Sequence, residues 1–300
     1  MTLDAKTDGA FWDYSWEEYG LYDDVANISH IKEISEVDKV FYIGFSLGTI
    51  QMFYGLAHKE DEFFADHVHK VIQLAPCYAG KPSICFDEEC VTKTRDMAAE
   101  LGIYSTFGPN WEENLEKIEK NFPEDVAAFY KSGNEWGLQP VSYKVQDHWN
   151  QQGVMNRFQE YADDWSQGVH ETELVPIENI KQVPITQFVA ENDQSCTIDT
   201  AMEYVKRIRS QTESIVVEGA DHMYFSSVAS DEWFMNHLLD QLQVEMTFDE
   251  KLDALTEAAE DVGDALQGLE KALNTLFMTD SAVYSFGVAA VVAAVASYTF

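Results

Sequence analysis

Basic residues are scarce in this sequence. Its 300 residues include 19 lysines and arginines against 53 aspartates and glutamates, which gives a formal net charge of −34 at pH 7. An acidic surface of this strength repels the phosphate backbones of DNA and RNA. We therefore expect that the protein does not bind nucleic acid.

Cysteine is also scarce, and its spacing argues against a metal site. The four cysteines form no CxxC pair and no Cys/His cluster with the spacing of metal ligands. We expect neither a metal nor an organic cofactor. Cys85 and Cys90 are spaced for a small disulfide loop, with two free thiols as the alternative, so the redox compartment stays open.

Apolar residues, by contrast, are frequent enough for a folded core, at 46% of the chain with 13% aromatic. Short β-branched and aromatic runs predict buried strands at 40–44, 69–77, 183–193 and 214–222, and helical segments lie between them. This alternation predicts an α/β fold with a parallel sheet. Functional residues of such sheets gather beyond the carboxyl ends of the strands.

The motif that points to chemistry is GFSLG at positions 44–48, which fits the GxSxG nucleophile elbow between a predicted strand and a predicted helix. The serine of an elbow projects from a sharp turn that needs small residues on both sides, and Gly44 and Gly48 would provide that room. We predict Ser46 as the nucleophile. The backbone N–H of Leu47, at the start of the helix, is the predicted oxyanion donor.

Such a serine needs a histidine base and an acid that orients the histidine, and these follow it in the order acid, then histidine. Of the eight histidines, only His222 follows a strand in the last part of the α/β pattern. We predict His222 as the base and Asp193, at the end of a predicted strand, as the acid. Asp199 is the alternative acid, although its position favours the N-cap of a helix that starts at Thr200.

Several segments resemble the acid lipase family, which includes the gastric and lysosomal lipases. FWDYSWEEYGLYDD (11–24) is similar to the family's FW-x-FSF-x-E-x-x-x-YD, and FYIGFSLGT is similar to its GHSQGT elbow, with Phe45 in place of histidine and Leu47 in place of glutamine. DHWNQQGVMNRFQEYADD (147–164) is similar to HW-x-Q…F-x-x-YD, VPITQFVAEND to VP…GNDxL, and DHMYF to NHLDF. The matches follow the family order from about Phe11 to Leu242.

The resemblance implies an α/β-hydrolase fold and the hydrolysis of triacylglycerols or sterol esters in lipid breakdown. It carries over Ser46 as nucleophile, Asp193 as acid and His222 as base. It also implies a lysosomal or secretory location, although the first twenty residues show no apolar run behind a basic region as a secretory signal would.

The predicted organisation has five parts. A hydrolase core comprises residues 1–77 and 183–244, a helical cap or lid residues 78–182, a heptad-patterned helix residues 245–280, and a hydrophobic segment residues 281–300. Five aromatic residues of the cap are candidates for acyl-chain contact, with core packing as the alternative: Phe107, Trp111, Trp136, Trp149 and Phe158.

The C-terminal fifth of the chain has its own pattern. Apolar residues from Leu252 to Leu276 step by three and four through four heptads, which predicts either an amphipathic helix on the core or a self-associating coiled coil. Ala282–Phe300 holds no charged residue and approaches the ~20 residues that a membrane-spanning helix needs. We expect membrane contact through this segment, with packing against the heptad helix as the alternative.

An α/β-hydrolase sheet normally places several strands before the nucleophile strand, and the residues before Val40 leave no room for them. We expect that these strands are missing, that the nucleophile strand forms a sheet edge, and that Leu47 acts as the sole oxyanion donor. Weak activity would follow. The rival interpretation is a non-catalytic remnant of a lipase that binds lipid or membrane without turnover.

Overall fold

The structure is a computed structural model that describes residues 3–5, 8–81, 85–106, 111–122, 124, 126–128, 131, 140–163, 171–226 and 231–242. The predictions for the heptad helix (252–276) and for the hydrophobic segment (282–300) lie outside the described residues. Among the residues that the structure does describe, no helix combines the length and the apolar character needed to cross a membrane.

Four parallel strands form the central sheet, in the spatial order β1-β2-β5-β6. Their bounds are Val40–Phe45 (β1), Val68–Leu74 (β2), Ile185–Ala190 (β5) and Thr212–Val217 (β6). Each strand overlaps one of the predicted strands, and the predicted α/β fold with a parallel sheet is confirmed. β1 lies at the edge of the described sheet, as the sequence predicts for the nucleophile strand.

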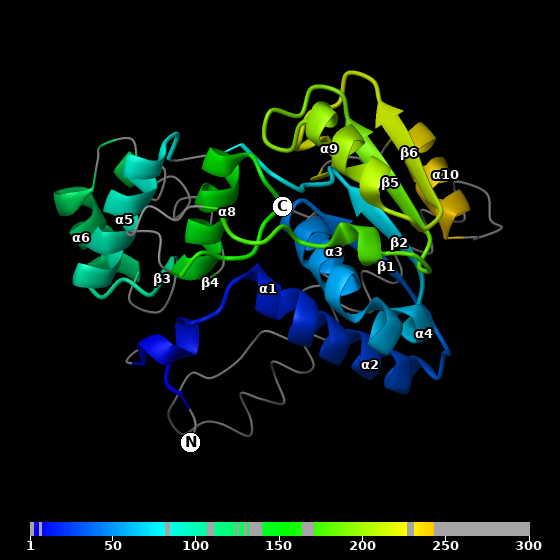
Figure 1. Cartoon of the computed structure of the whole chain (residues 1–300), viewed down its shortest axis with the longest axis horizontal. Helices are drawn as coiled ribbons and strands as arrows, with labels where there is room; N and C mark the ends of the chain where they lie inside the picture. Colours follow the sequence, from blue (N-terminus) through cyan, green and yellow to red (C-terminus); the bar gives the residue numbers. More distant parts are fainter. Residues whose placement is uncertain are drawn as a thin grey trace.

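Helices precede, connect and follow the strands (Figure 1). The α-helices whose bounds are described are α1 (Trp16–Glu18), α2 (Asp24–Ser35), α3 (Leu47–Lys59), α4 (Ala65–His67), α5 (Glu88–Glu100), α6 (Trp111–Asn121), α8 (Tyr143–Met155), α9 (Ile198–Tyr204) and α10 (Glu232–Gln241). The short 3-10 helices are η1 (Gly9–Trp12), η5 (Ile177–Asn179), η6 (Val205–Arg207) and η7 (Tyr224–Ser226), and the π-helical turns are η2 (Tyr19–Asp23) and η3 (Glu60–Phe64).

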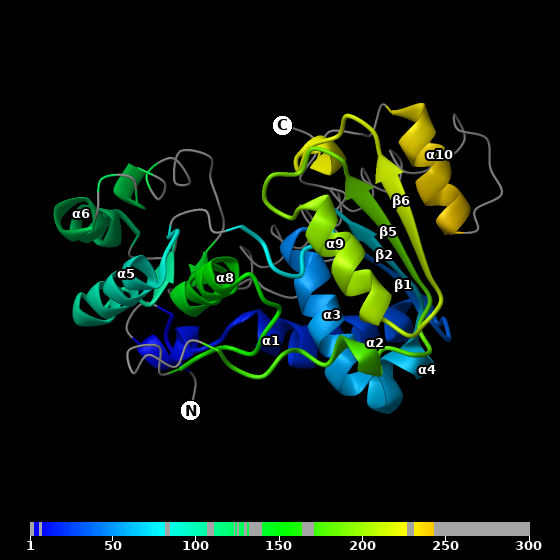
Figure 2. The ribbon, with the colours of Figure 1, turned by 45° about the horizontal axis from the view of Figure 1, so that its top comes forward.

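Successive strand residues point to opposite faces of the sheet, and helices pack against both faces. On one face, Val71 and Ile185 pack with residues of α3 and α9 in the larger core cluster. On the other face, Ile72 and Phe188 pack with Phe234 and other residues of α10. Figure 2 shows α3 and α9 on one side of the strands and α10 on the other.

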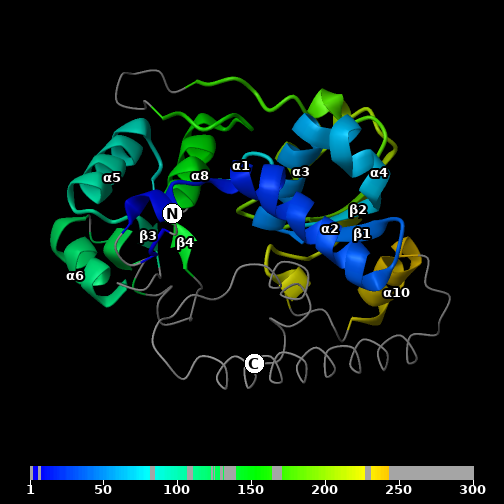
Figure 3. The ribbon, with the colours of Figure 1, turned by 90° about the horizontal axis from the view of Figure 1, so that it is seen from below.

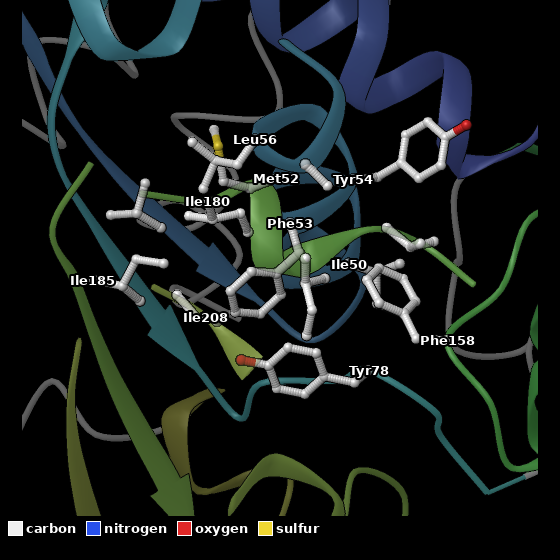
Figure 4. Packing of buried hydrophobic residues seen from close by; sticks show 14 of the residues in the cluster. Ile50, Met52, Phe53, Tyr54, Leu56, Tyr78, Phe158, Ile180, Ile185 and Ile208 are labelled. Carbon is white, nitrogen blue, oxygen red and sulfur yellow. The ribbon is translucent and has the colours of Figure 1, made fainter. Parts of the chain in front are cut away.

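The centre of the larger cluster is the apolar side of α3 (Figure 4). Phe53 stacks on Tyr78, with ring centroids 4.4 Å apart, and Phe158 reaches the same cluster from the chain after α8. Burial of these large side chains fixes α3 against the sheet. The corner between β1 and α3 is therefore held in place by the packing of α3 on the sheet.

A second region, formed by α5, α6 and α8, lies beside the sheet and has its own apolar cluster. We call it the helical region. It also contains a short antiparallel pair, β3 (Ser105–Thr106) with β4 (Val141–Ser142), which the sequence did not predict because two-residue strands carry no alternation. α1 and α2 run from the helical region to the sheet in both views (Figures 1 and 3).

Two disulfide bonds cross-link the described chain. Cys85 is bonded to Cys90, so the first of the two alternatives that the sequence allowed, a small disulfide loop, is present and the thiols are not free. Cys77 is bonded to Cys196, a pair 119 residues apart that the sequence did not predict. The second bond joins the chain after β2 to the chain after β5, two strands that are neighbours in the sheet.

Candidate active site

Ser46 occupies the sharp corner between β1 and α3. Its backbone has φ 52° and ψ −114°, a conformation that strains any residue with a Cβ. The Ser46 N–H donates to Leu74 O (3.1 Å), and the Ser46 carbonyl oxygen accepts from the N–H and the hydroxyl of Thr49 (2.9 and 2.6 Å). Hydrogen bonds to β2 and to α3 thus hold the N–H and the carbonyl group of the strained residue.

The two glycines of the corner do different things. A Cβ on Gly44 would lie 2.7 Å from the carbonyl oxygen of Gly48, a backbone atom that has no room to move. A Cβ on Gly48 would meet only Tyr42 Oη, at 3.8 Å, which is ordinary contact. The expectation that both glycines are needed for space is therefore wrong for Gly48. The carbonyl oxygen of Gly48 has the structural role, because it occupies the space beside Gly44 and accepts a hydrogen bond from Tyr42 Oη at 2.8 Å.

The structure brings Ser46, His222 and Asp193 together at the carboxyl edge of the sheet. His222 lies in the loop after β6, with Nε2 2.8 Å from Ser46 Oγ and Nδ1 2.7 Å from Asp193 Oδ2. Because a carboxylate only accepts, Nδ1 carries the proton and Nε2 is left to accept from the serine hydroxyl. The Asp193 side chain is fully buried and that of His222 is 18% exposed, so the acid is shielded while the base reaches solvent.

Asp193 is oriented by its own loop. Its Oδ1 accepts from the backbone N–H groups of Ser195 and Cys196, both at 2.8 Å, while Oδ2 faces His222. These two donors fix the orientation of the carboxylate, so that Oδ2 stays directed at His222. Sequence reasoning missed these donors, although the short turn that follows Asp193 is a common place for them.

Asp199 lies within the first turn of α9, and the prediction that it caps this helix is wrong. The helix begins at Ile198, and the N-cap is Thr197, whose side chain accepts from Thr200 N at 3.5 Å. A carboxylate in the first turn still complements the helix dipole.

Leu47, the predicted oxyanion donor, is the first residue of α3. The N–H groups of a helix's first turn have no acceptor within the helix. The Leu47 N–H is therefore available beside the nucleophile. Phe45 adds an apolar surface, with its ring centroid 5.3 Å from that of His222.

Of the five aromatic residues predicted to contact an acyl chain, the structure describes the side chains of two, Phe158 and Trp149. Phe158 is fully buried and packs against Trp16 and Tyr78, so its side chain belongs to the core. Trp149 is partly buried beside the same cluster, where its ring occupies the space next to Gly80. Phe107 and Trp136 lie outside the described residues, as does the side chain of Trp111.

A second histidine, His148, lies near the carboxyl groups of Glu17 and Glu160 where α1 meets α8. His148 is fully buried, stacks on Trp16 with centroids 4.0 Å apart, and its Nε2 lies 2.9 Å from Gln159 O. Its Nδ1 lies 3.9 Å from Glu17 Oε1 and makes no hydrogen bond to the described residues. Burial lowers the pKa of His148 to about 3, so this ring is neutral in the folded protein at ordinary pH.

Glu17 and Glu160 lie together beside this histidine. Burial, with the nearby charge of Glu160, raises the pKa of Glu17 to about 8. Although burial alone would raise the pKa of Glu160, hydrogen bonds from His58 (3.1 Å) and Tyr54 (2.6 Å) hold it below its usual value. One carboxyl of the pair therefore stays protonated while the other is charged.

No protein-family model matches the chain. Among curated proteins, it is similar to lipase lipl-5 of Caenorhabditis elegans, with 46% identity over 67 residues that cover 22% of this chain and 16% of that protein. It is also similar to Lipase 1 of Drosophila melanogaster, with 26% identity over 226 residues, 65% of this chain and 48% of that protein. The matches thus span at most about half the length of these two relatives.

Solved structures to which the chain is similar include a monoacylglycerol lipase from Paleococcus ferrophilus. It is 17% identical, with a TM-score of 0.44 over 76% of this chain and 75% of that one. The α/β hydrolase GrgF from Penicillium sp. sh18 is 14% identical, with the same TM-score over 76% and 71%. The parallel sheet with a strained serine between strand and helix is the arrangement expected of an α/β-hydrolase, and the predicted fold class is confirmed.

Proposed function

We propose that this chain, which is similar to curated lipases and has the α/β-hydrolase fold, hydrolyses carboxylic esters of lipids. Ser46 is the proposed nucleophile, His222 the general base, and Asp193 the acid that orients His222. The observation that carries the proposal is the unbroken series of contacts from Asp193 Oδ2 through both His222 nitrogens to Ser46 Oγ. Contacts of 2.7 and 2.8 Å need no rearrangement before proton transfer.

In the acylation step, Ser46 Oγ attacks the ester carbonyl carbon while His222 Nε2 takes the hydroxyl proton. Asp193 keeps the ring in position and stabilises the imidazolium that forms. The Leu47 N–H donates to the negative oxygen of the tetrahedral intermediate. His222 then gives its proton to the leaving alcohol, and an acyl-Ser46 ester remains.

In the deacylation step, a water molecule takes the place of the alcohol. His222 Nε2 removes one of its protons as the water oxygen attacks the acyl carbon, and the proton returns to Ser46 Oγ when the fatty acid leaves. The proposed mechanism uses no metal and no organic cofactor.

A fluorophosphonate probe tests the chemistry directly, because it labels an activated serine and needs little else. We expect labelling of the full chain at Ser46, and none of the Ser46→Ala variant. Ser226 is the matched control, a second partly buried serine near the site whose hydroxyl instead donates to Met223 O. Ser226→Ala should be labelled like the wild type. A folded chain that resists the probe would favour the rival interpretation, a non-catalytic lipid-binding protein.

The proposed substrate is a water-insoluble ester, a triacylglycerol or a sterol ester. The similarity to curated lipases supports it, as does the apolar ring of Phe45 beside His222. We expect higher specific activity on emulsified than on dissolved tributyrin. Equal activity on both forms, with no gain on longer acyl chains, would reduce the proposal to a general esterase.

Two partner proposals concern residues outside the described part. We propose that Ala282–Phe300 contacts a membrane and that Leu252–Leu276 mediates self-association. Carbonate extraction of membranes from expressing cells tests the first proposal, and full release of the chain would refute it. Sedimentation equilibrium of the full chain tests the second, which a single monomeric species would refute.

A further inference from the structure

The disulfide between Cys77 and Cys196 lies directly beside the proposed catalytic residues. Both cysteines are buried, at 0% and 2% exposed, and both sulfurs come within 4.8 Å of a ring nitrogen of His222. Cys77 follows β2, and Cys196 belongs to the loop after β5 that also carries Asp193. The bond therefore joins two loops that meet under the histidine.

On one side, the bridge leads to the acid. The N–H of Cys196 donates to Asp193 Oδ1 at 2.8 Å, and the neighbouring Ser195 N–H donates to the same oxygen. Any shift of residues 195 and 196 therefore moves the carboxylate that orients His222. The same loop is tied a second time, since Ser195 O accepts from the N–H of Lys81 at 2.7 Å.

On the other side, the bridge leads to the nucleophile. The N–H of Cys77 donates to Thr49 Oγ1 at 2.9 Å, and this hydroxyl donates to the carbonyl oxygen of Ser46 at 2.6 Å. Thr49 is fully buried in the first turn of α3. One covalent bond and three hydrogen bonds thus connect the Ser46 backbone to the Asp193 carboxylate without passing through His222.

We propose that the Cys77–Cys196 disulfide is a positioning element for the acid: it holds the Asp193 loop at the distance from the Ser46 corner that lets His222 contact both. This proposal rests on the function proposed above. Two bonded sulfurs lie ~2.05 Å apart, whereas unbonded sulfur atoms need roughly 3.5–4 Å. Reduction of the bond would push the two loops apart, and alanine at both positions would leave the loops without their covalent link. In either case a misplacement of about 1 Å can lower a rate ~100-fold.

The test compares two paired replacements in the full chain. Cys77→Ala with Cys196→Ala should lower kcat by roughly 10- to 100-fold with little change in KM, because the acid and not the substrate site is displaced. Cys85→Ala with Cys90→Ala is the matched control. This second disulfide belongs to a separate small cluster with Val91 and Ala162, and its loss should change kcat less than about twofold.

A double-mutant cycle separates positioning from general support of the fold. In an Asp193→Asn background, removal of Cys77 and Cys196 should have almost no further effect on kcat, because the bridge acts through the acid. An equal loss in both backgrounds would overturn the proposal. So would an unchanged kcat in the folded Cys77→Ala/Cys196→Ala variant.

Titration of the wild type with dithiothreitol covers the case in which the variant does not fold. The reductant's thiolate attacks one sulfur, the S–S bond breaks, and two cysteine thiols and one oxidised dithiothreitol result. Alkylation of withdrawn aliquots measures how many thiols of Cys77 and Cys196 are free, and activity should fall as these thiols appear while circular dichroism stays unchanged. Reoxidation of the unalkylated sample should restore the activity. Activity lost only together with the fold would overturn the proposal, since the bridge would then hold the chain and not the acid.

A readout independent of turnover distinguishes this proposal from the proposed function. The downfield proton resonance of His222 Nδ1–H reports its hydrogen bond to Asp193. It should be present in the wild type and lost or shifted after the bridge is removed. If the wild type hydrolyses no ester but shows this change, only the proposed function fails. If it is active and the resonance persists without the bridge, only the positioning proposal fails.

Discussion

Two sites among the described residues, in each of which a histidine lies beside carboxylates, differ in burial and in hydrogen bonding. At the sheet edge, both nitrogens of His222 have partners, and the ring reaches solvent. Where α1 meets α8, His148 is fully buried under Trp16, and one nitrogen has no hydrogen bond among the described residues. The first arrangement lets a proton move between partners, whereas the second keeps the ring neutral. A histidine beside an acid is therefore no sign of catalysis by itself.

The largest effect is expected at the sheet-edge site. Asp193→Asn should lower kcat for p-nitrophenyl butyrate by roughly 10⁴-fold, because the amide no longer holds the His222 tautomer that accepts from Ser46. Asp199→Asn is the control and should stay within a few-fold of the wild type, since Asp199 lies in the first turn of α9. If the control lost the activity and Asp193→Asn kept it, the assignment of the acid would be reversed.

The opposite pattern is expected at the buried site. His148→Ala should lower the free energy of unfolding by about 3 kcal/mol, because it leaves a cavity beside Trp16 and removes the hydrogen bond to Gln159. Activity per folded molecule should change less than about threefold. Urea denaturation measures the free energy of unfolding. The ester assay, divided by the number of sites that the fluorophosphonate probe labels, gives the activity per folded molecule.

Exposed His30 on α2 serves as the control for this measurement. His30→Ala should leave stability within about 0.5 kcal/mol of the wild type. A large loss of turnover in correctly folded His148→Ala would instead show that the buried site contributes to the reaction.

A smaller effect, visible only as pH changes, is expected at Glu17. Its pKa is raised to about 8 in the folded protein, so the folded state holds a proton that the unfolded state has released above its usual pKa of about 4.5. The stabilisation is complete below that value and is lost as the pH rises toward and through 8. Between pH 6 and pH 8 this group should remove about 2 kcal/mol of stability.

Glu17→Gln should flatten this loss, because the amide has no proton to release. Denaturant unfolding at several pH values gives the difference between variant and wild type. Glu33→Gln, on the exposed side of α2, should reproduce the wild-type pH profile. Identical profiles for Glu17→Gln and the wild type would show that the buried pair does not share a proton.

The smallest effect is expected at Gly48, in the corner that carries Ser46. Gly48→Ala should change stability by less than about 1 kcal/mol and leave kcat nearly unchanged, because the added methyl group meets only Tyr42 Oη. Gly44→Ala is the contrasting variant, with a Cβ placed 2.7 Å from a backbone oxygen, and should be clearly destabilised. Thermal unfolding and the ester assay measure both.

Much of the sheet could be located from the sequence because each strand is a short apolar run. Ile185–Ala190, for example, is buried at every position, and such runs stand out against helical periodicity. The proposed site residues follow from the same signal, since they come after strands that end at one edge. The ends of the strands are harder to predict. The sequence predicts a strand at 214–222, whereas β6 ends at Val217, and Gly219 adopts φ 73° between the strand and His222.

Features that depend on distant contacts could not be predicted. Cys77 and Cys196 are 119 residues apart, and only the pairing of β2 with β5 makes them neighbours. Glu17 and Glu18 are adjacent and chemically alike in the sequence. Yet Glu18 accepts from Ser15 N at 2.7 Å as part of a capping box, while Glu17 turns into the protein and accepts from Tyr161 N. That difference is set by the packing of α1, which local patterns do not report.

The backbone of Ser46 also bears on how such a chain would evolve. At φ 52° and ψ −114°, a glycine would adopt the corner without the strain of roughly 1–3 kcal/mol that a Cβ brings. Selection for stability alone would therefore favour replacement of the serine, whereas the reaction proposed above gives a reason for its retention. If the proposed reaction were no longer under selection, we would expect a glycine at this position early, because it relieves the backbone strain.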